Sequence, residues 1–433
     1  MKEMLESQYE GFLASYEEPC YRGIRLNLLK CSLEILKESL PFELSPSKFS
    51  EDSFYAPTGE KFGGLFAHHA GMFYSQEPSA SSAVTILDPN PGEKILDLCA
   101  APGGKSTQIA ARLEGKGLLW ANEIVRQRAN ILLSNIERMG VKNAVVSSLS
   151  PEKLCAAFPQ FFDKLLVDAP CSGEGMFKKE PQAIEGWSTE NVEMCARRQL
   201  SILDSAAAAL KLGGVMVYST CTFSKEENEY TVAAFLEAHP EFELLPIEVG
   251  FGRSAFGMPA LRIFPMDGGE GHFVAKLRKK FAESDMLEDR SLSGFTGDKK
   301  QPMLETAKKL YSEMFSDHVP PMTQIRDKIY ILPDMLPNIG KIPVLRAGVL
   351  FGEVKGGRIE PAHAVFMSKN AGECQHVLEL DPLSGEKYFR GEEIDCGSKG
   401  YTAVSVNKVV TGFGKASGGR LKNKYPKGLR SRR

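Results

Sequence analysis

The segment Lys94–Thr107, KILDLCAAPGGKST, constrains the fold and the function of this chain more than any other. Its first part, Lys94–Cys99, reads as a buried strand, the next residues include two glycines, and a helix is expected from about Lys105. A strand, a glycine-containing turn and a helix in this order point backbone N–H groups at a ligand, which approaches closely where glycine has no side chain. We therefore expect a site for a ligand with a negative group, such as a phosphate or a carboxylate.

The class of this turn follows from its glycines and from the next strand. Gly104-Lys105-Ser106 is similar to the end of a P-loop, but the first glycine of that motif would fall on Cys99. A nucleotide-like cofactor turn remains. Such a turn is followed by an acidic residue that binds ribose hydroxyls, and Glu123 ends the expected strand Leu118–Glu123 at that place.

Strand-like runs and helical patterns alternate after the turn, which predicts a mainly parallel sheet with helices on both faces. Two late strands, Leu261–Phe264 and His272–Leu277, are joined by a Gly-rich loop typical of an antiparallel hairpin. This α/β pattern fits the methyltransferase variant of the Rossmann design. The other elements expected there are Ser79–Leu87, Lys105–Leu113, Ile124–Met139, Ala144–Ser147, Lys164–Asp168, Val192–Leu210, Val215–Thr220 and Lys225–Ala238.

The flanking regions predict smaller domains. Residues 1–80 form a small α+β segment, whose aromatic residues in Phe54–Tyr74 are interpreted as core rather than as a surface that stacks on bases. Residues 81–280 form the Rossmann-like domain, and residues 281–340, with a polar start at Phe281–Met303, form a linker and intermediate segment. Residues 341–433 form a β-rich domain with strands expected at Val344–Val354, Ala364–Met367 and Tyr401–Val410.

Two cysteines follow two of the expected strands. Asp168-Ala169-Pro170-Cys171 ends one strand, and Ser219-Thr220-Cys221 ends another. Because ligands of open parallel sheets bind at the carboxyl ends of the strands, both thiols are expected beside the cofactor turn. A single cysteine is usually a small buried apolar residue, whereas two on one functional edge favour nucleophilic chemistry.

A thiol beside a methyl donor has a defined chemical use. Carbon 5 of cytosine is a poor nucleophile, and addition of a thiolate to C6 enables C5 to attack an electrophilic methyl group. Asp168 is placed to hydrogen-bond the base near N3 and N4, and the base must leave its stack to enter such a site. Spacing alone does not decide whether Cys171 or Cys221 is the nucleophile.

The chain resembles the RNA cytosine-5 methyltransferases of the NOL1/NOP2/Sun family in three blocks, LDLCAAPGGKS, DAPCSGEGMF and STCTFSKEENE. Its end, GFGKASGGRLKNKYPKGLR, is similar to that of the bacterial 16S rRNA methyltransferase F group, which has a PUA-like RNA-binding domain there. The resemblance implies RNA binding by the N-terminal segment, Cys221 as nucleophile, and Cys171 as the residue that assists product release. It implies S-adenosylmethionine as cofactor, bound by Cys99, Ala100, Ala101, Pro102, Gly103, Gly104, Lys105, Glu123, Arg128 and Asp168.

One departure from the family pattern follows the third expected strand. Leu149 stands where an acidic residue or Asn is usual near the adenine, next to Ser148, which has a hydroxyl to offer. Either the affinity for the cofactor is then reduced, or the adenine is held mainly by apolar contact.

Composition limits the partners and the compartment. The net charge is −2, so contact with RNA must come from local patches, and the stretch Gly414–Arg433 has eight Lys or Arg and no acidic residue. That stretch is either an RNA contact or a solvated tail. Nine cysteines without a C-x-x-C pair, no membrane-length apolar run and no signal peptide predict a cytoplasmic, metal-free protein without a membrane partner, which we expect to be a monomer.

The leading hypothesis is an S-adenosylmethionine-dependent RNA cytosine-5 methyltransferase acting on 16S rRNA or the small ribosomal subunit, with tRNA as the nearest alternative substrate. A non-catalytic RNA-binding assembly factor is a rival, supported by Leu149 and disfavoured by the intact Cys171, Cys221 and Asp168. A DNA cytosine methyltransferase is disfavoured by the second thiol and by the lack of an evident large target-recognition segment after the core.

Overall fold

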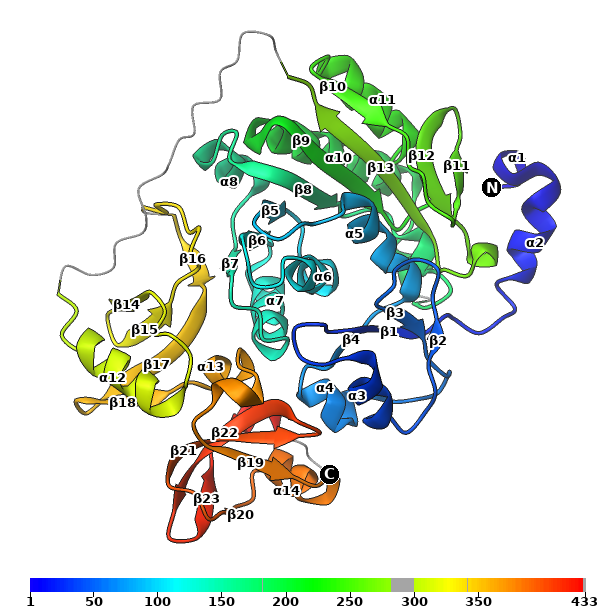
Figure 1. Ribbon diagram of the computed structural model, residues 1–433. Coiled ribbons are helices and arrows are strands. Elements are labelled where there is room, and N and C mark those ends of the chain that lie inside the picture. Colours follow the sequence, from blue (N-terminus) through cyan, green and yellow to red (C-terminus); the bar gives the residue numbers. More distant parts are fainter. Residues whose placement is uncertain (181, 282–299, 341, 431–433) are drawn as a thin grey trace.

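The computed structural model describes residues 1–180, 182–281, 300–340 and 342–430. Within these residues a ten-stranded sheet has the order β11-β12-β13-β9-β8-β5-β6-β7-β16, with β10 paired to β13 (Figure 1). The central strands from β9 to β7 are parallel, and the strands added at both edges are antiparallel. The strands are β5 (Lys94–Asp97), β6 (Leu118–Asn122), β7 (Ala144–Ser147), β8 (Phe162–Asp168), β9 (Leu210–Thr220), β10 (Phe242–Leu245), β11 (Arg253–Ala255), β12 (Met258–Ile263), β13 (His272–Lys279) and β16 (Val344–Ala347).

Helices lie on both faces of this sheet, because parallel strands need crossover connections. Neighbouring residues of one strand pack into hydrophobic cores on opposite faces of the sheet. Trp120 and Tyr218 belong to the core on one face, whereas Ala121 and Val217 belong to the core on the other. The helices of this domain include α5 (Ser82–Leu87), α6 (Gly104–Arg112), α7 (Arg126–Arg138), α8 (Pro151–Ala157), α10 (Thr189–Ala209) and α11 (Glu229–Ala238).

The predicted α/β Rossmann-like class is confirmed, including the antiparallel hairpin, in which Leu261 of β12 pairs with Val274 of β13. Two boundaries differ from expectation by four or five residues, more than the others. The helix expected from Lys225 begins at Glu229, because the preceding residues form the loop that follows β9. The strand expected from Val215 begins earlier, at the first residue of β9.

The N-terminal region is a small α+β domain, as predicted. Its sheet has the order β2-β3-β1-β4, and Phe54, Phe62, Phe73 and Tyr74 are all buried, which confirms the core interpretation for these rings. The elements include β1 (Gly23–Leu26), β2 (Ser45–Pro46), β3 (Ser53–Tyr55), β4 (Phe73–Ser75), α1 (Lys2–Leu5), α2 (Tyr9–Ala14), α3 (Leu33–Glu38), α4 (Phe66–His69) and the short 3-10 helix η3 (Pro78–Ser81).

Two smaller sheets follow the central domain, with the orders β14-β15-β17-β18 and β19-β21-β22-β23-β20. The first takes strands from both sides of residue 341, where the sequence suggested a domain start. Most of the expected linker, residues 282–299, lies outside the described residues. The elements here include α12 (Leu304–Met314), β14 (Met322–Ile325), β15 (Lys328–Ile331), β17 (Val349–Lys355), β18 (Arg358–Pro361), α13 (His363–Met367), β19 (Val377–Leu380), α14 (Pro382–Arg390), β20 (Ile394–Asp395), β21 (Gly400–Val406), β22 (Val409–Ser417) and β23 (Arg420–Asn423).

Three expectations for this region are wrong. The strand expected at Ala364–Met367 is helix α13, because a short apolar run suits a buried helix as well as a strand. The strand expected at Val344–Val354 is divided at Gly348, whose φ of +68° favours glycine and whose added Cβ would lie 2.0 Å from the Ile331 carbonyl oxygen. The strand expected at Tyr401–Val410 is also two strands, joined by a turn at residues 407 and 408 with positive φ.

The two ends of the chain meet. The Lys30 ammonium group donates to the carbonyl oxygens of Met367 and Val410, at 2.7 and 3.0 Å. Val409 at the start of β22 packs in the core of the N-terminal domain, and α4 lies against α14 (Figure 1). The C-terminal sheets are therefore packed against the N-terminal domain.

Candidate active site

The glycine turn lies between β5 and α6, as predicted. Gly103 has a φ of +113°, and a Cβ on Gly104 would lie 3.3 Å from the Tyr74 ring, so both positions suit glycine. Arg25 of β1, only 1% exposed, donates to the Gly104 carbonyl oxygen and to Thr107 Oγ1. The N-terminal domain thus holds the start of α6 in place.

Glu123 and Arg128 lie beside this turn. The Glu123 side chain is buried at the end of β6, and its Oε1 accepts from the Val125 amide at 2.9 Å. Arg128 Nη1 lies 3.3 Å from Glu123 Oε2, and its Nη2 donates to the Ala101 carbonyl oxygen at 2.9 Å. The structure therefore brings the predicted acidic residue and the turn into one site.

The segment with Leu149 is held by its backbone. The buried Asn122 side chain accepts from the Leu149 amide at 3.1 Å and donates to the Leu149 carbonyl oxygen at 3.0 Å. The Leu149 side chain packs against the core cluster around Trp120, and the Ser148 hydroxyl donates to the Ile124 carbonyl oxygen. Leu149, which departs from the family pattern, thus places an apolar side chain next to Asn122.

The two thiols are in contact. Asp168 pairs with Ser219 across β8 and β9, so the residues that follow these strands lie together, and the Sγ atoms of Cys171 and Cys221 are 3.3 Å apart. The hydrogen bond from Cys171 lowers the pKa of the Cys221 thiol, and positive charge on His272 and Lys105 acts in the same direction. The same bond, together with burial, raises the pKa of Cys171. Cys221 is therefore the better thiolate, and Cys171 the better proton donor.

Lys105 connects the thiols to the cofactor turn. Its ammonium group lies 2.7 Å from Asp168 Oδ2, and the Ser219 hydroxyl donates to Asp168 Oδ1 at 2.7 Å. Burial opposes the charge on Lys105, but Asp168 prevails and raises the pKa of Lys105. A fixed ion pair thus joins the first residues of α6 to the end of β8.

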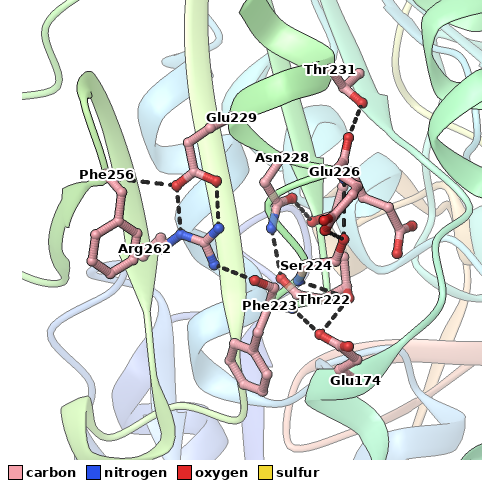
Figure 2. Close-up of polar contacts among 12 residues, drawn as sticks. Glu174, Thr222, Phe223, Ser224, Glu226, Asn228, Glu229, Thr231, Phe256 and Arg262 are labelled. Atoms are coloured by element: carbon pink, nitrogen blue, oxygen red, sulfur yellow. Dashed lines mark hydrogen bonds and ion pairs between the residues drawn. The ribbon is translucent and has the colours of Figure 1, made fainter. Parts of the chain in front are cut away.

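The loop that carries Cys221 is held from two sides (Figure 2). Glu174 Oε2 accepts from Thr222 Oγ1 at 3.0 Å and from the Phe223 amide at 2.9 Å. On the other side, Asn228 Nδ2 donates to the Thr222 carbonyl oxygen at 3.0 Å. These bonds fix the backbone directly after Cys221, so its side chain direction is set before any ligand binds.

A buried ion pair supports the same loop (Figure 2). Arg262 of β12 and Glu229 at the start of α11 are joined by two bonds, of 2.7 and 2.5 Å, and are almost fully buried. The remaining Arg262 nitrogen donates to the Phe223 carbonyl oxygen at 3.0 Å. The hairpin strand predicted from the sequence thus supplies a group that holds the loop of Cys221.

The Cys171 loop has a separate support. The buried Glu227 carboxylate accepts from the Ser172 amide at 3.0 Å, from Gln199 Nε2 at 2.8 Å and from the Ser172 hydroxyl. Burial raises the pKa of Glu227. The residues after each thiol are therefore anchored independently.

Sequence reasoning missed the supporting residues Arg25, Glu174, Glu227, Glu229 and Arg262. Three of them had a signal, because the blocks DAPCSGEGMF and STCTFSKEENE contain Glu174, Glu227 and Glu229. Arg25 and Arg262 had a weaker one, each as a single charge within an apolar strand whose partners are distant in the sequence.

Comparison with known proteins identifies the family. The model described as 16S rRNA methyltransferase RsmB/F matches residues 84–278, and models for the RsmF N-terminal, first C-terminal and PUA domains match residues 1–78, 308–368 and 375–431. Proteins named ribosomal RNA small subunit methyltransferase F, from Shigella dysenteriae and Escherichia coli O157:H7, are each 32% identical, over 99% of this chain and 95% of the relative. The chain belongs to the RsmF family. Its expected cofactor, S-adenosylmethionine, is confirmed with this membership.

Solved structures similar to this RsmF family member support the same fold. A methyltransferase homologue from Pyrococcus horikoshii is 28% identical with a TM-score of 0.57, over 64% of this chain and 92% of the other. NSun6 from Pyrococcus horikoshii, determined with the S-adenosylmethionine analogue SFG, is 25% identical with a TM-score of 0.59, over 65% of this chain and 97% of the other. The PUA family match confirms the predicted PUA-like C-terminal region.

The described residues offer neither a candidate metal site nor a candidate membrane-spanning helix. Those residues contain no group of three or more His, Cys, Asp or Glu side chains that could hold a metal ion. Among the described helices, none has the length and the apolar character needed to cross a membrane.

Proposed function

We propose that this RsmF family member is a cytoplasmic RNA cytosine-5 methyltransferase that modifies 16S rRNA through a covalent bond between Cys221 and C6 of the target base. The observation that carries the proposal is the contact between the Sγ atoms of Cys171 and Cys221, whose pKa values move in opposite directions. An enzyme that forms and then releases a C6 adduct needs one thiolate that bonds to C6 and a second group that takes the proton from C5.

The residues at the glycine turn fit S-adenosylmethionine. The turn brings free backbone close to a ligand at Gly103 and Gly104, and the start of α6 is suited to the methionine carboxylate of a donor that has no phosphate. Glu123 is the acidic residue for the ribose hydroxyls, Arg128 holds that residue, and Leu149 offers apolar contact to the adenine. When bound, the cofactor supplies an electrophilic methyl group.

The protein residues carry the remaining steps. Cys221 Sγ, as thiolate, bonds to C6 of the flipped cytosine, and the electron pair moves to C5, which then takes up the methyl group. Asp168 hydrogen-bonds the base near N3 and N4, and Lys105 and Ser219 hold its carboxylate in one orientation. We assign the release to Cys171: once Cys221 is bonded to C6 it no longer raises the pKa of Cys171, whose proton goes to solvent. The Cys171 thiolate takes the C5 proton, the C–H electron pair re-forms the C5–C6 double bond, and Cys221 leaves as a thiolate.

RNA binding is supported by the charge on the C-terminal sheet. Lys415 of β22 and Lys422 of β23 are exposed and pair directly in the ladder, so two like charges lie on one face. Like charges directly opposite each other destabilise a sheet, and phosphate groups remove that cost. Leu421 and Tyr425 from the same stretch are buried, so this is a folded basic surface rather than a free tail.

The test is methyl transfer to defined RNA. Purified protein with labelled S-adenosylmethionine is expected to methylate 16S rRNA or small-subunit particles, and bisulfite sequencing is expected to map the product to cytosine. If methyl transfer occurs only to tRNA, the substrate is tRNA rather than 16S rRNA, and the proposed chemistry is unchanged. Cofactor binding by calorimetry without transfer to any of these RNAs would favour the non-catalytic assembly factor. An unchanged methylation map in cells without the gene would refute the rRNA assignment.

A further inference from the structure

His272 lies opposite the proposed nucleophile on the neighbouring strand. In the antiparallel ladder of β13 and β9, Phe273 pairs with Thr220. His272 is the first residue of β13 and Cys221 directly follows β9, so the two residues are the chain neighbours of this last pair. The His272 side chain is 10% exposed, so its charge is little screened by solvent.

Glu77 holds His272 from the N-terminal side of the central domain. Its Oε2 lies 3.3 Å from His272 Nε2. The same carboxylate caps the helix η3, accepting from the amides of Ser79 and Ala80 at 2.8 and 3.0 Å and from the Ser79 hydroxyl at 2.7 Å. Burial opposes the charge, yet the bonds from His272 and Ser79 prevail and lower the pKa of Glu77. The carboxylate therefore stays ionised beside the imidazole of His272.

The other charged groups around this pair do not replace Glu77. Glu270 is two residues from His272, but burial raises the pKa of Glu270, which favours its neutral form. The positive charge of Lys178 lowers the pKa of Glu270, but its effect is smaller than that of burial. On the side of the thiols, the charge of Lys105 is matched by Asp168 at 2.7 Å. The positive groups that lower the pKa of Cys221 are His272 and Lys105, and of these two His272 has the larger effect.

We propose that His272, held by Glu77, is a positioning residue that presents a positive charge to Cys221 and so favours the thiolate of the nucleophile. The proposal rests on the proposed function, in which Cys221 attacks C6. It assigns a role to two residues outside the three signature blocks, one from each side of the glycine turn in the sequence. Because solvent screens charges weakly in a buried site, loss of the His272 charge is expected to shift the titration of Cys221.

The test measures thiolate formation directly, without RNA or cofactor. Full-length protein is alkylated with iodoacetamide from about pH 5 to about pH 10, and peptide mass spectrometry follows Cys221 alone. His272→Gln and Glu77→Gln are each expected to raise the midpoint by about 0.5–1 pH unit, which is about a 3- to 10-fold lower rate near neutral pH. His239→Gln is the matched control, because His239, directly after α11, also pairs with carboxylates, those of Asp204 and Glu241, and should leave the midpoint unchanged.

A fixed charge separates electrostatics from shape. His272→Lys keeps a cation at this position, so its midpoint is expected to remain near that of the unaltered protein. An unchanged midpoint in His272→Gln, or an equal shift in His272→Lys and His272→Gln, overturns the proposal. Failure of the proposed function is seen elsewhere, as RNA methylation by Cys221→Ala, and does not depend on the alkylation result.

Discussion

Cys171 and Cys221 have different chemical properties although both are thiols at the ends of neighbouring strands. A shared hydrogen bond can leave only one proton between two sulfur atoms, so a lower pKa at Cys221 accompanies a higher pKa at Cys171. The ranking of the two thiols therefore comes from the proton they share and the charges around them, not from the spacing of the residues.

We predict opposite results for the two cysteine variants. Cys221→Ala should reduce methyl transfer to background, because no sulfur remains to bond C6. Cys171→Ala should still form the adduct and release it slowly, so a protein–RNA complex should accumulate and survive denaturing electrophoresis. Cys195→Ala, a buried thiol on α10, is the control and should retain activity. Exchange of the two phenotypes would reverse the assignment of nucleophile and releasing group.

Asp97 under the cofactor turn should make stability depend on pH. Burial raises the pKa of Asp97 to about 7, whereas an unfolded Asp titrates near pH 3.9. The folded state therefore binds a proton that the unfolded chain lacks from about pH 4 to about pH 7, so the free energy of unfolding falls as the pH rises through this window. Asp97→Asn keeps an acceptor for Ser106 and removes the charge.

Thermal unfolding at about pH 5 and about pH 8 checks this expectation. The loss of melting temperature between the two should be smaller in Asp97→Asn than in the unaltered protein. Asp88→Asn changes an exposed carboxylate after α5 and should leave the difference as it was. Equal pH dependence in Asp97→Asn and the unaltered protein would show that Asp97 ionises freely in the folded state.

At the scale of elements, the buried pair Arg262–Glu229 joins β12 to α11 and to the loop of Cys221. Arg262→Met should destabilise the protein by about 3–5 kcal/mol, because it leaves the Glu229 carboxylate buried without its partner. The double variant Arg262→Met with Glu229→Met should recover most of this loss. Chemical denaturation, monitored by the tryptophan fluorescence of the central domain, measures the free energy of unfolding of both variants.

An exposed pair of the same sheet is the control. Arg278 and Glu243 join β13 to β10 with side chains 47% and 38% exposed. Arg278→Met should cost less than about 1 kcal/mol, because solvent screens such a pair. A similar cost for Arg262→Met would mean that the loop of Cys221 does not depend on the buried pair.

An element was predictable from the sequence where the interactions that form it join residues close together in the chain. The strands β5 to β9 and the turn after β5 were predictable, because alternation of strand and helix and the position of glycine are local in the sequence. Helix α13 was not, because its four apolar residues fit either structure until the surrounding sheets are known. Arg25 and Arg262, which support the site, lie on distant strands. The sequence shows each only as a single charge in an apolar strand, without the partners that the fold gives it.

For the molecule as a whole, the basic surface of the C-terminal sheet should control the salt dependence of RNA binding. Lys415→Gln and Lys422→Gln together remove two exposed charges, so the slope of log K against log salt should fall by about 1.5, at about 0.7–0.9 per phosphate contact. Filter binding of 16S rRNA at several salt concentrations measures the slope.

The control for this slope is Lys355, whose charge is already compensated by Glu353 at 2.9 Å and Glu360 at 3.7 Å. Lys355→Gln should leave the slope unchanged. An equal slope in the double variant and the unaltered protein would place the phosphate contacts on another surface, and the basic ladder would then need a different explanation.

The meeting of the two chain ends has a consequence for biosynthesis. A ribosome makes residues 1–80 first, yet the core of that domain includes Val409, and its Lys30 bonds to carbonyl groups of residues 367 and 410. Arg25 of the same domain in turn holds the glycine turn after β5. The domain formed by residues 1–80 therefore completes its packing only when residues up to 410 have been translated, so its order of assembly differs from the order of synthesis.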